Sequence, residues 1–306
     1  MSVIVVSDYS SGAARTWTDE RACLSALADQ RGDIAFDVLL LEDEKYRDSY
    51  PADILSIIPG TRVIFSQAGS SYALKNAGVR EATAPIVVVL DADCRPDSGW
   101  LSLAVAALRS NPDVAAVSGR TLYEGGELLT RVLGLLTRSY LDPGKPGPGR
   151  FIANNAAAFR HNVLIDHPLP EDLGPFSSRV QSESMRRAGH KLWFEPRMRV
   201  IHEFEGLSME ADIRRNIGYG TVATRIAEPS LPYAGLVRIG AVATPVIFGA
   251  KLLNTWRDCV RCASDYGVRW FELPFALGAA VIVNIMEIPG MLAAYRRLPI
   301  ERTAYR

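Results

Sequence analysis

Two aspartates separated by one residue follow the most strongly strand-like run of the sequence. Asp91 and Asp93 come directly after residues 86–90, a β-branched apolar run that predicts a buried strand. Two carboxylates this close repel each other unless a cation lies between them or one turns away. A hard divalent ion, Mn²⁺ or Mg²⁺, prefers oxygen ligands of this kind together with phosphate oxygens. The spacing therefore predicts a metal site, against the alternative of an ordinary strand-terminating turn.

The elements around this pair predict a sheet that positions it. Short apolar runs alternate with helical patterns over about the first 100 residues. The runs are 3–6, 36–41, 62–65 and 84–90, and the helical patterns are 16–30 and 72–81. This alternation is typical of a mostly parallel sheet with helices on both faces, an α/β fold. Three runs end in acids, at Asp8, at Glu42 with Asp43, and at Asp91, and ligands of such sheets bind beyond the strands' carboxyl ends.

The second half of the chain continues this pattern and then changes. Residues 101–138 are predicted to be mainly helical with a strand near 114–118, and a Pro- and Gly-rich loop follows at 142–149. A further α/β stretch extends to about residue 205. We therefore expect a catalytic domain over residues 1–205 and a helical C-terminal region over residues 206–306.

Two apolar windows make this C-terminal region a candidate for membrane contact. Residues 234–253 and 275–294 are each near the length that spans a bilayer, but both contain charged residues and proline. If both spanned, Arg257, Arg261 and Arg269 would lie outside, against the positive-inside tendency. The alternatives are a spanning hairpin, helices in the membrane interface, or a packed helical subdomain. We expect association with the cytoplasmic side of the cell membrane.

Composition limits the other classes of function. The 34 basic and 34 acidic residues cancel, so no nucleic acid partner is expected. Four cysteines are too few for a disulfide framework, which favours a reducing compartment, and Cys259 and Cys262 are expected to pack on one helix face. The N-terminus lacks a basic segment before its short apolar run, so it predicts a first strand and not a signal peptide.

The longest motif connects these features to a known family. Residues 69–93, GSSYALKNAGVREATAPIVVVLDAD, resemble the signature of family-2 glycosyltransferases of the GT-A fold. Residues 23–30, 151–160 and 188–202 are similar to the family pattern in the same order, so the resemblance covers about residues 2–205.

The resemblance implies a nucleoside-diphosphate sugar as donor and Mn²⁺ or Mg²⁺ as cofactor. It implies that Asp43, with Glu42, contacts the base or ribose, that Asp91 lies near the ribose and the metal, and that Asp93 binds the metal. His202 is in a position to complete the metal shell, or is a structural histidine. The predicted nucleotide-binding residues are Asp8, Glu42, Asp43, Asn76, Asp91 and Arg214, and the predicted metal ligands are Asp91, Asp93 and His202.

The sequence departs from the family at the general base. An inverting transferase needs a carboxylate on the acceptor side, and the family places Glu-Asp about eleven residues before Gly189, where this chain has Ser178. Glu183 is our first candidate for this catalytic base and Asp172 the second; each is otherwise a surface or helix-capping acid. The Gln-x-x-Arg-Trp motif of processive synthases is missing, which predicts transfer of a single sugar.

The predicted function is metal-dependent, inverting transfer of one sugar to a glycan or lipid-linked acceptor. A sugar nucleotidyltransferase is a weaker alternative, because the segment after the first strand has a single glycine, Gly12, where those enzymes carry a Gly-rich phosphate loop. A membrane-associated protein that binds sugar nucleotides without transferring them is the other alternative, because the Glu-Asp pair is missing.

Overall fold

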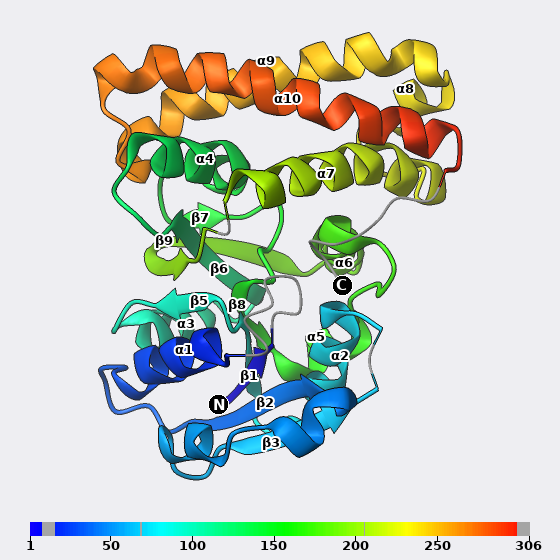
Figure 1. The fold of residues 1–306 in the computed structure, drawn as a ribbon. Helices are drawn as coiled ribbons and strands as arrows, with labels where there is room; N and C mark the ends of the chain where they lie inside the picture. Colours follow the sequence, from blue (N-terminus) through cyan, green and yellow to red (C-terminus); the bar gives the residue numbers. More distant parts are fainter. Residues whose placement is uncertain (8–15, 68, 205, 299–306) are drawn as a thin grey trace.

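A mixed sheet forms the centre of the computed structural model, which describes residues 1–7, 16–67, 69–204 and 206–298 (Figure 1). Within these residues the sheet has nine strands in the order β3-β2-β1-β4-β8-β6-β9-β5, with β7 beside β9. Six strands run in one direction, as their pairing shows. They are β1 (Ser2–Val6), β2 (Asp37–Asp43), β3 (Arg62–Ser66), β4 (Ile86–Asp91), β6 (Val114–Tyr123) and β9 (Lys191–His202). The predicted mostly parallel α/β sheet is confirmed.

Three shorter strands run against this direction. They are β5 (Cys94–Pro96), β7 (Gly147–Pro148) and β8 (Ala156–Arg160). Strand β8 lies between β4 and β6, with Ala156 opposite Leu90. Because β8 is antiparallel, its amino end meets the carboxyl end of β4, so residues just before Ala156 reach the edge where Asp91 lies.

Helices cover both faces of the sheet because its central strands are apolar on both sides. On one face, α1 (Thr18–Ala28) and α3 (Trp100–Ser110) pack on Val3, Val5 and Leu90. On the other, α2 (Ser71–Glu81), α5 (His161–Asp166) and α6 (Ser177–Arg187) pack on alternate residues of the same strands, such as Ile4 and Val89. Figure 1 shows these two sets on opposite sides of β1.

A separate layer of helices lies beyond the β6 and β9 side of the sheet, at the top of Figure 1. It contains α4 (Leu128–Arg138), α7 (Leu207–Ala227), α8 (Ala234–Arg238), α9 (Thr244–Cys262) and α10 (Leu273–Tyr295). Cys259 and Cys262 are buried here against α4 and α10, as expected for apolar packing on one helix face. Because α4 comes from the middle of the chain, the layer is tied to the sheet by more than one connection. The boundary that we predicted at residues 205 and 206 falls between β9 and α7 and stays a prediction.

Short 3-10 helices complete the described chain. They are Glu44–Ser49, Ala52–Ser56, Ser139–Leu141, Gly174–Phe176, Ala241–Ala243, Ala263–Tyr266 and Trp270–Glu272.

Helices α7 and α10 approach each other closely at two glycines. A Cβ atom on Gly218 would lie 1.9 Å from the carbonyl oxygen of Glu287, and one on Gly290 would lie 1.9 Å from that of Arg215. No side chain fits at either position, so the two backbones touch directly. This contact holds α10 along α7 with its polar residues turned inward, as the buried Asn284 and Glu287 show.

The two apolar windows form different structures. Residues 234–253 do not make one helix, because Gly240, with φ at 95°, separates α8 from α9. The second window lies within α10, and by length and composition the described segment Trp270–Tyr295 could cross a bilayer. In the structure α10 instead lies flat on α7, beside α9.

Candidate active site

The candidate active site is a cavity of about 390 Å³ at the carboxyl edge of the sheet. It extends from the ends of β1 and β4 into the helical layer, where α7, α8, α9 and α10 contribute to its wall. Because β8 lies antiparallel beside β4, Asn154 and Asn155, just before β8, line the cavity. Tyr123 and His202 line it from the ends of β6 and β9. Of the predicted residues, Asp91, Asp93, His202 and Arg214 line this cavity.

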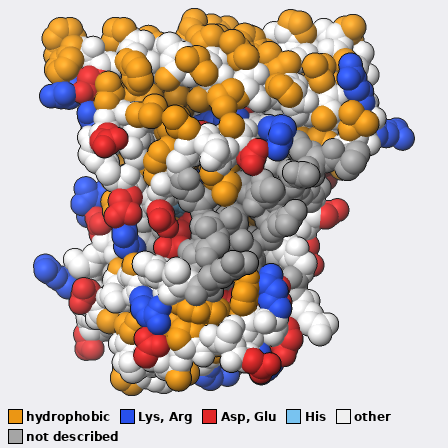
Figure 2. Space-filling view, viewed as in Figure 1, with side chains coloured by type: hydrophobic (Ala, Val, Ile, Leu, Met, Phe, Trp, Pro, Cys, Tyr) orange, Lys and Arg blue, Asp and Glu red, His pale blue; other side chains and the backbone are white. Residues whose placement is uncertain are grey.

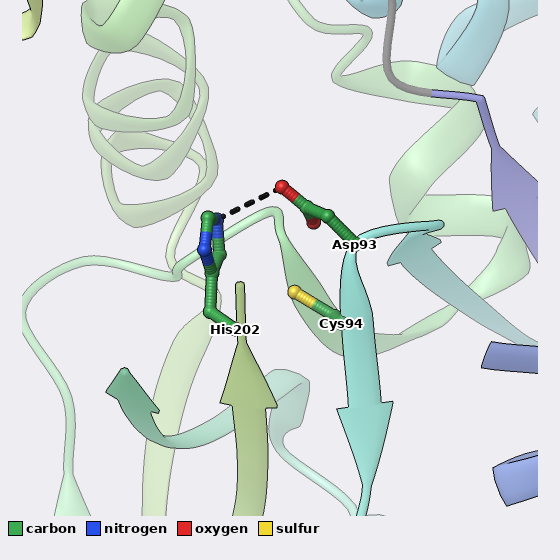
Figure 3. A group of neighbouring side chains, drawn as sticks. All are labelled: Asp93, Cys94 and His202. Atoms are coloured by element: carbon green, nitrogen blue, oxygen red, sulfur yellow. Dashed lines mark ion pairs between the residues drawn. The ribbon is translucent and has the colours of Figure 1, made fainter. Parts of the chain in front are cut away.

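Asp93 and His202 face each other from two neighbouring strand ends (Figure 3). His202 Nε2 lies 3.1 Å from a carboxylate oxygen of Asp93, because Cys94, the next residue, pairs with His202 in the β5–β9 ladder. His202 Nδ1 donates a hydrogen bond of 2.7 Å to the carbonyl oxygen of Glu203, which fixes the other nitrogen toward the aspartate. A ring nitrogen lone pair and a carboxylate oxygen at this distance need a proton or a cation between them.

The donor set therefore suits a divalent metal. Asp93, Cys94 and His202 each offer one ligand atom within 4.8 Å of the others. Burial and the charge of Asp93 raise the pKa of the Cys94 thiol well above its usual value, and its sulfur accepts a hydrogen bond from Asn155. A protonated thiol is a poor partner for Mn²⁺ or Mg²⁺, so the oxygen of Asp93 and the nitrogen of His202 are the ligands that fit.

Asp91 forms an ion pair with a lysine. Its carboxylate lies 2.6 Å from Lys75 Nζ, and the lysine side chain is buried. The charge of Lys75 offsets that of Asp91 and so reduces the repulsion expected between Asp91 and Asp93. The sequence reasoning did not select Lys75, although it lies inside the quoted motif one residue before Asn76. A basic residue, Lys75, on the helix before the strand that ends in Asp91 was the pattern that could have predicted this ion pair.

A further acid near Asp93 and His202 was also missed. Asp19, in the first turn of α1, has a pKa raised well above its usual value by burial and by a hydrogen bond to Glu203. The charges of Asp93 and Glu20 add to the same effect. Carboxyl groups gathered in this way favour a bound cation.

The acids at the end of β2 lie outside the wall of the cavity. Glu42 is fully buried, and burial raises its pKa to about 7. One of its oxygens accepts the backbone N–H of Asp43 at 2.7 Å. Asp43 caps the 3-10 helix that follows by accepting the N–H of Lys45. Asp8 lies outside the described residues.

Asn76 and Arg214 are held by other parts of the protein. Asn76 is buried outside the cavity wall and binds the backbone of Leu169 and the side chain of Glu171, so it anchors a loop. Arg214 lines the cavity, but Glu210 accepts its Nε–H at 2.6 Å and Glu287 lies 3.8 Å from it. Its charge is paired inside the protein, and its predicted contact with a diphosphate stays a prediction.

Neither candidate base lies in the wall of the cavity. Glu183, on α6, forms ion pairs with Arg186 at 2.9 Å and with Arg187 at 3.8 Å. Asp172 is exposed in the loop before α6. The first turn of α6 does reach the cavity, but through Ser178 and Arg179. The helix expected to carry a carboxylate into the site therefore carries a hydroxyl and a guanidinium there.

Comparisons with known proteins point to a family and to a fold. The family model described as "Glycosyl transferase family 2" matches residues 18–167. Glycosyltransferase AglE from Haloferax volcanii is 25% identical over 122 residues, 39% of this chain and 38% of AglE. The chain therefore matches less than two fifths of the length of that relative.

Solved structures show the same fold over a longer stretch. A mannosyltransferase, PcManGT from Pyrobaculum calidifontis in complex with GDP-Man and Mn²⁺, is similar with a TM-score of 0.59 and 16% identity. The match covers 96% of this chain and 86% of that one, so it includes most of the helical layer. The predicted GT-A fold is confirmed.

Proposed function

Because this chain belongs to glycosyl transferase family 2 through its residues 18–167, we propose that it transfers a sugar from a nucleoside-diphosphate sugar to an acceptor. The observation that carries the proposal is the pair formed by Asp93 and His202 at the carboxyl edge of the sheet. A metal at this pair would suit the diphosphate of a donor, in the manner of the mannosyltransferase complex with GDP-Man and Mn²⁺.

The chemistry assigns a task to each side chain. The acceptor oxygen attacks the anomeric carbon, the bond from that carbon to the donor's diphosphate breaks, and the nucleoside diphosphate leaves with the bonding electrons. A divalent ion, when bound, would stabilise the negative charge on this leaving group. Asp93 and His202 would hold that ion, and Lys75 would keep Asp91 in position beside it. A single displacement of this kind inverts the anomeric carbon.

We also propose that the helical layer lies on a membrane surface. Large apolar side chains are exposed along α9, α10 and the turn between them, and Figure 2 shows them gathered at the top of the molecule. They are Val242, Val246, Leu253, Val260, Trp270, Phe271, Phe275, Ile282 and Ile285. Val246, Leu253 and Val260 are seven residues apart, so they form one stripe along α9.

The exposed charges of this region support the proposal that the apolar face contacts an anionic lipid surface. Over residues 234–298, all of them described, the exposed charged residues are arginines, and each of the four acids is buried or half-buried. The exposed arginines are Arg238, Arg257, Arg261, Arg269, Arg296 and Arg297. A helix with an apolar face and a basic rim binds in the membrane interface. The inward direction of Asn284 and Glu287 favours this position over a spanning hairpin.

The alternative of binding without transfer has one observation in its favour, since neither Glu183 nor Asp172 lines the cavity. A measurement of turnover distinguishes a transferase from a protein that only binds sugar nucleotides. Release of free sugar or of glycosylated product from a sugar nucleotide supports a transferase, whereas binding with no turnover on membrane lipid extract supports the alternative. Pyrophosphate release from a nucleoside triphosphate and a sugar phosphate would instead indicate a nucleotidyltransferase.

The test of the proposal is a thermal-shift screen with UDP-, GDP- and dTDP-sugars, with and without Mn²⁺, followed by a donor hydrolysis assay. We expect one nucleotide class to raise the melting temperature only when Mn²⁺ is present. Asp93→Asn should abolish the Mn²⁺-dependent rise in melting temperature. Asp113→Asn, a change of the same kind in the exposed loop before β6, should leave this rise intact. Equal behaviour of the two variants would contradict the proposed site.

A further inference from the structure

Two cations in the wall of the cavity form no ion pair with any residue that the structure describes. Among the described residues, six basic side chains line the cavity, Lys75, Arg138, Arg179, Arg214, Arg225 and Lys251, and four carboxylates, Asp91, Asp93, Asp258 and Glu287. Among the described residues, Arg179 and Arg225 make no ion pair, whereas Arg214 and Lys251 both contact Glu287. A cavity built with an excess of positive charge favours an anionic ligand.

The two guanidinium groups are held in place by neutral contacts. Arg179, at the start of α6, lies over the ring of Phe151 with 4.5 Å between its Cζ and the ring centre. Arg225, on α7, is buried and donates hydrogen bonds of 2.7 Å to the carbonyl oxygens of Pro232 and Thr221. Both positions are therefore fixed before any ligand arrives, which lowers the entropy cost of binding.

Arg179 and Arg225 repel each other and are both repelled by Arg150. Burial, together with the charges of Arg179 and Arg150, lowers the pKa of Arg225 to about 10. Burial, with the charge of Arg150, also lowers the pKa of Arg179. An anion between these guanidinium groups would relieve this repulsion, and their planar forks suit phosphate oxygens.

The carboxylates of the cavity are all engaged. Asp91 contacts Lys75, Asp93 contacts His202, Asp258 contacts Arg261, and Glu287 contacts Lys251 and Arg214. In the described part of the cavity wall, no carboxylate is left over to take a proton from an acceptor hydroxyl. An acceptor oxygen that is already an anion needs no such base.

Apolar side chains line the same cavity next to these arginines. Leu236 and Val237 on α8 and Ile247 on α9 belong to its wall, and the backbone that binds Arg225 leads directly into α8. These helices belong to the layer whose outer face carries the exposed apolar residues. A ligand that fits combines a phosphate with a hydrocarbon chain.

We propose that the acceptor is a lipid phosphate monoester, held by Arg179 and Arg225, whose phosphate oxygen is itself the nucleophile. The inference rests on the proposed function, because it names the acceptor of that same transfer. The phosphate oxygen forms the new bond to the anomeric carbon as the bond to the nucleoside diphosphate breaks. The products are a lipid-linked sugar phosphate and the free nucleoside diphosphate, and no proton has to be removed from the acceptor.

Binding of farnesyl phosphate to the full chain tests this site directly. By isothermal titration in detergent, we expect farnesyl phosphate to bind at least tenfold more tightly than farnesol or inorganic phosphate. Arg179→Gln should weaken the binding of farnesyl phosphate at least tenfold and leave the binding of UDP or GDP with Mn²⁺ within twofold. Arg225→Lys, which keeps the charge, should retain more affinity than Arg225→Gln, and Arg109→Gln on the exposed face of α3 should change nothing.

Three outcomes would overturn the inference. Equal affinity for farnesol and farnesyl phosphate would show that the site does not recognise the phosphate. Equal affinity for inorganic phosphate and farnesyl phosphate would show that it does not recognise the hydrocarbon chain. An equal loss of UDP or GDP binding in Arg179→Gln would assign the arginines to the donor. Failure of the proposed function is separate, because it would appear as no Mn²⁺-dependent nucleotide binding by the unmodified protein.

Transfer provides the second measurement. With the donor found in the screen, labelled sugar should appear on farnesyl phosphate and not on farnesol. Arg179→Gln should raise the KM for farnesyl phosphate at least tenfold with the donor KM unchanged. Transfer to farnesol at a comparable rate would contradict a phosphate nucleophile.

Discussion

At the scale of single residues, Asp93 and His202 are brought together by the pairing of two strands that are far apart in the sequence. His202 ends β9, and Asp93 precedes β5, which pairs with it. The hydrogen bond from His202 to the carbonyl of Glu203 keeps Nε2 directed at Asp93. In this arrangement Nε2 faces the carboxylate, which is why we propose His202 as a ligand of a bound ion.

The first prediction concerns this histidine. His202→Gln should weaken Mn²⁺-dependent binding of UDP or GDP by about tenfold or more, because a nitrogen ligand is lost. The loss should be smaller with Mg²⁺, which prefers oxygen and to which the new amide oxygen is a suitable ligand. Metal titrations at fixed nucleotide measure both. An equal loss for the two metals would show that His202 does not bind the ion.

The second prediction concerns pH and Glu42. Its folded pKa of about 7 lies above the ordinary value of 4.5 for this side chain, so the folded state retains a proton that the unfolded state releases. The free energy of unfolding should therefore fall as pH rises from 4.5 to 7 and show no further change from this group above that range. The size of this loss is about 3 kcal/mol, from about 1.4 kcal/mol per pKa unit.

Glu42→Gln removes this dependence. Relative to the unmodified protein, the variant should gain about 3 kcal/mol in free energy of unfolding between pH 5 and pH 8, as measured by urea denaturation. Glu81→Gln, the same change on the exposed end of α2, should show no such gain. If both variants follow the unmodified protein across this range, Glu42 does not carry a buried proton.

At the scale of elements, the close contact of α7 and α10 positions the inner wall of the cavity. Arg214 on α7, Lys251 on α9 and Glu287 on α10 form one buried charge group, which requires all three helices to stay in register. The absence of a side chain at Gly218 and Gly290 permits this approach. Sequence patterns predicted the helices but not which faces meet, since that depends on contacts between residues about 70 positions apart.

The third prediction tests this contact. Gly290→Ala should lower the free energy of unfolding by about 2 kcal/mol, because its Cβ would overlap the backbone of Arg215, which cannot move aside easily. Gly278→Ala, on the same helix with open space around its Cβ, should raise it by about 0.5 to 1 kcal/mol. Thermal or urea denaturation of the two variants provides the comparison. A similar effect of both changes would mean that the helices do not touch at Gly290.

At the scale of the whole molecule, one cavity extends from the sheet edge into the helical layer whose outer face is apolar. The metal pair belongs to the sheet edge, and the wall formed by α8 and α9 belongs to the layer with the exposed apolar residues. This arrangement suits an enzyme that takes a water-soluble donor from one side and an amphiphilic acceptor from the other.

The fourth prediction concerns the outer face. The protein should co-sediment with vesicles that contain phosphatidylglycerol, more weakly with neutral vesicles and more weakly at high salt, because the exposed charged residues over 234–298 are arginines. Replacing Trp270 and Phe271, which are 85% and 53% exposed, with serine should reduce binding at least about tenfold. Ile165→Ser, an exposed apolar residue on α5, is the control. An unchanged double variant would place the membrane contact elsewhere.

The sequence by itself determined the features that depend on neighbouring residues. The apolar runs predicted the parallel strands, and the motif that ends at Asp93 predicted the family and the metal site, since strand period and motif spacing are local properties. His202 was also selected, because its context matched the family in the same order.

Only the tertiary structure decided which charges face the cavity. Lys75 pairs with Asp91, Asp19 lies by Glu203, and Arg214 is neutralised by Glu210 and Glu287, none of which follows from spacing along the chain. The candidate bases Glu183 and Asp172 were chosen by their distance from Gly189, but distance along the chain does not determine which side of a helix meets the ligand. The folded chain instead brings Arg179 and Arg225 there, because long-range packing determines which described cations line the cavity without an ion pair.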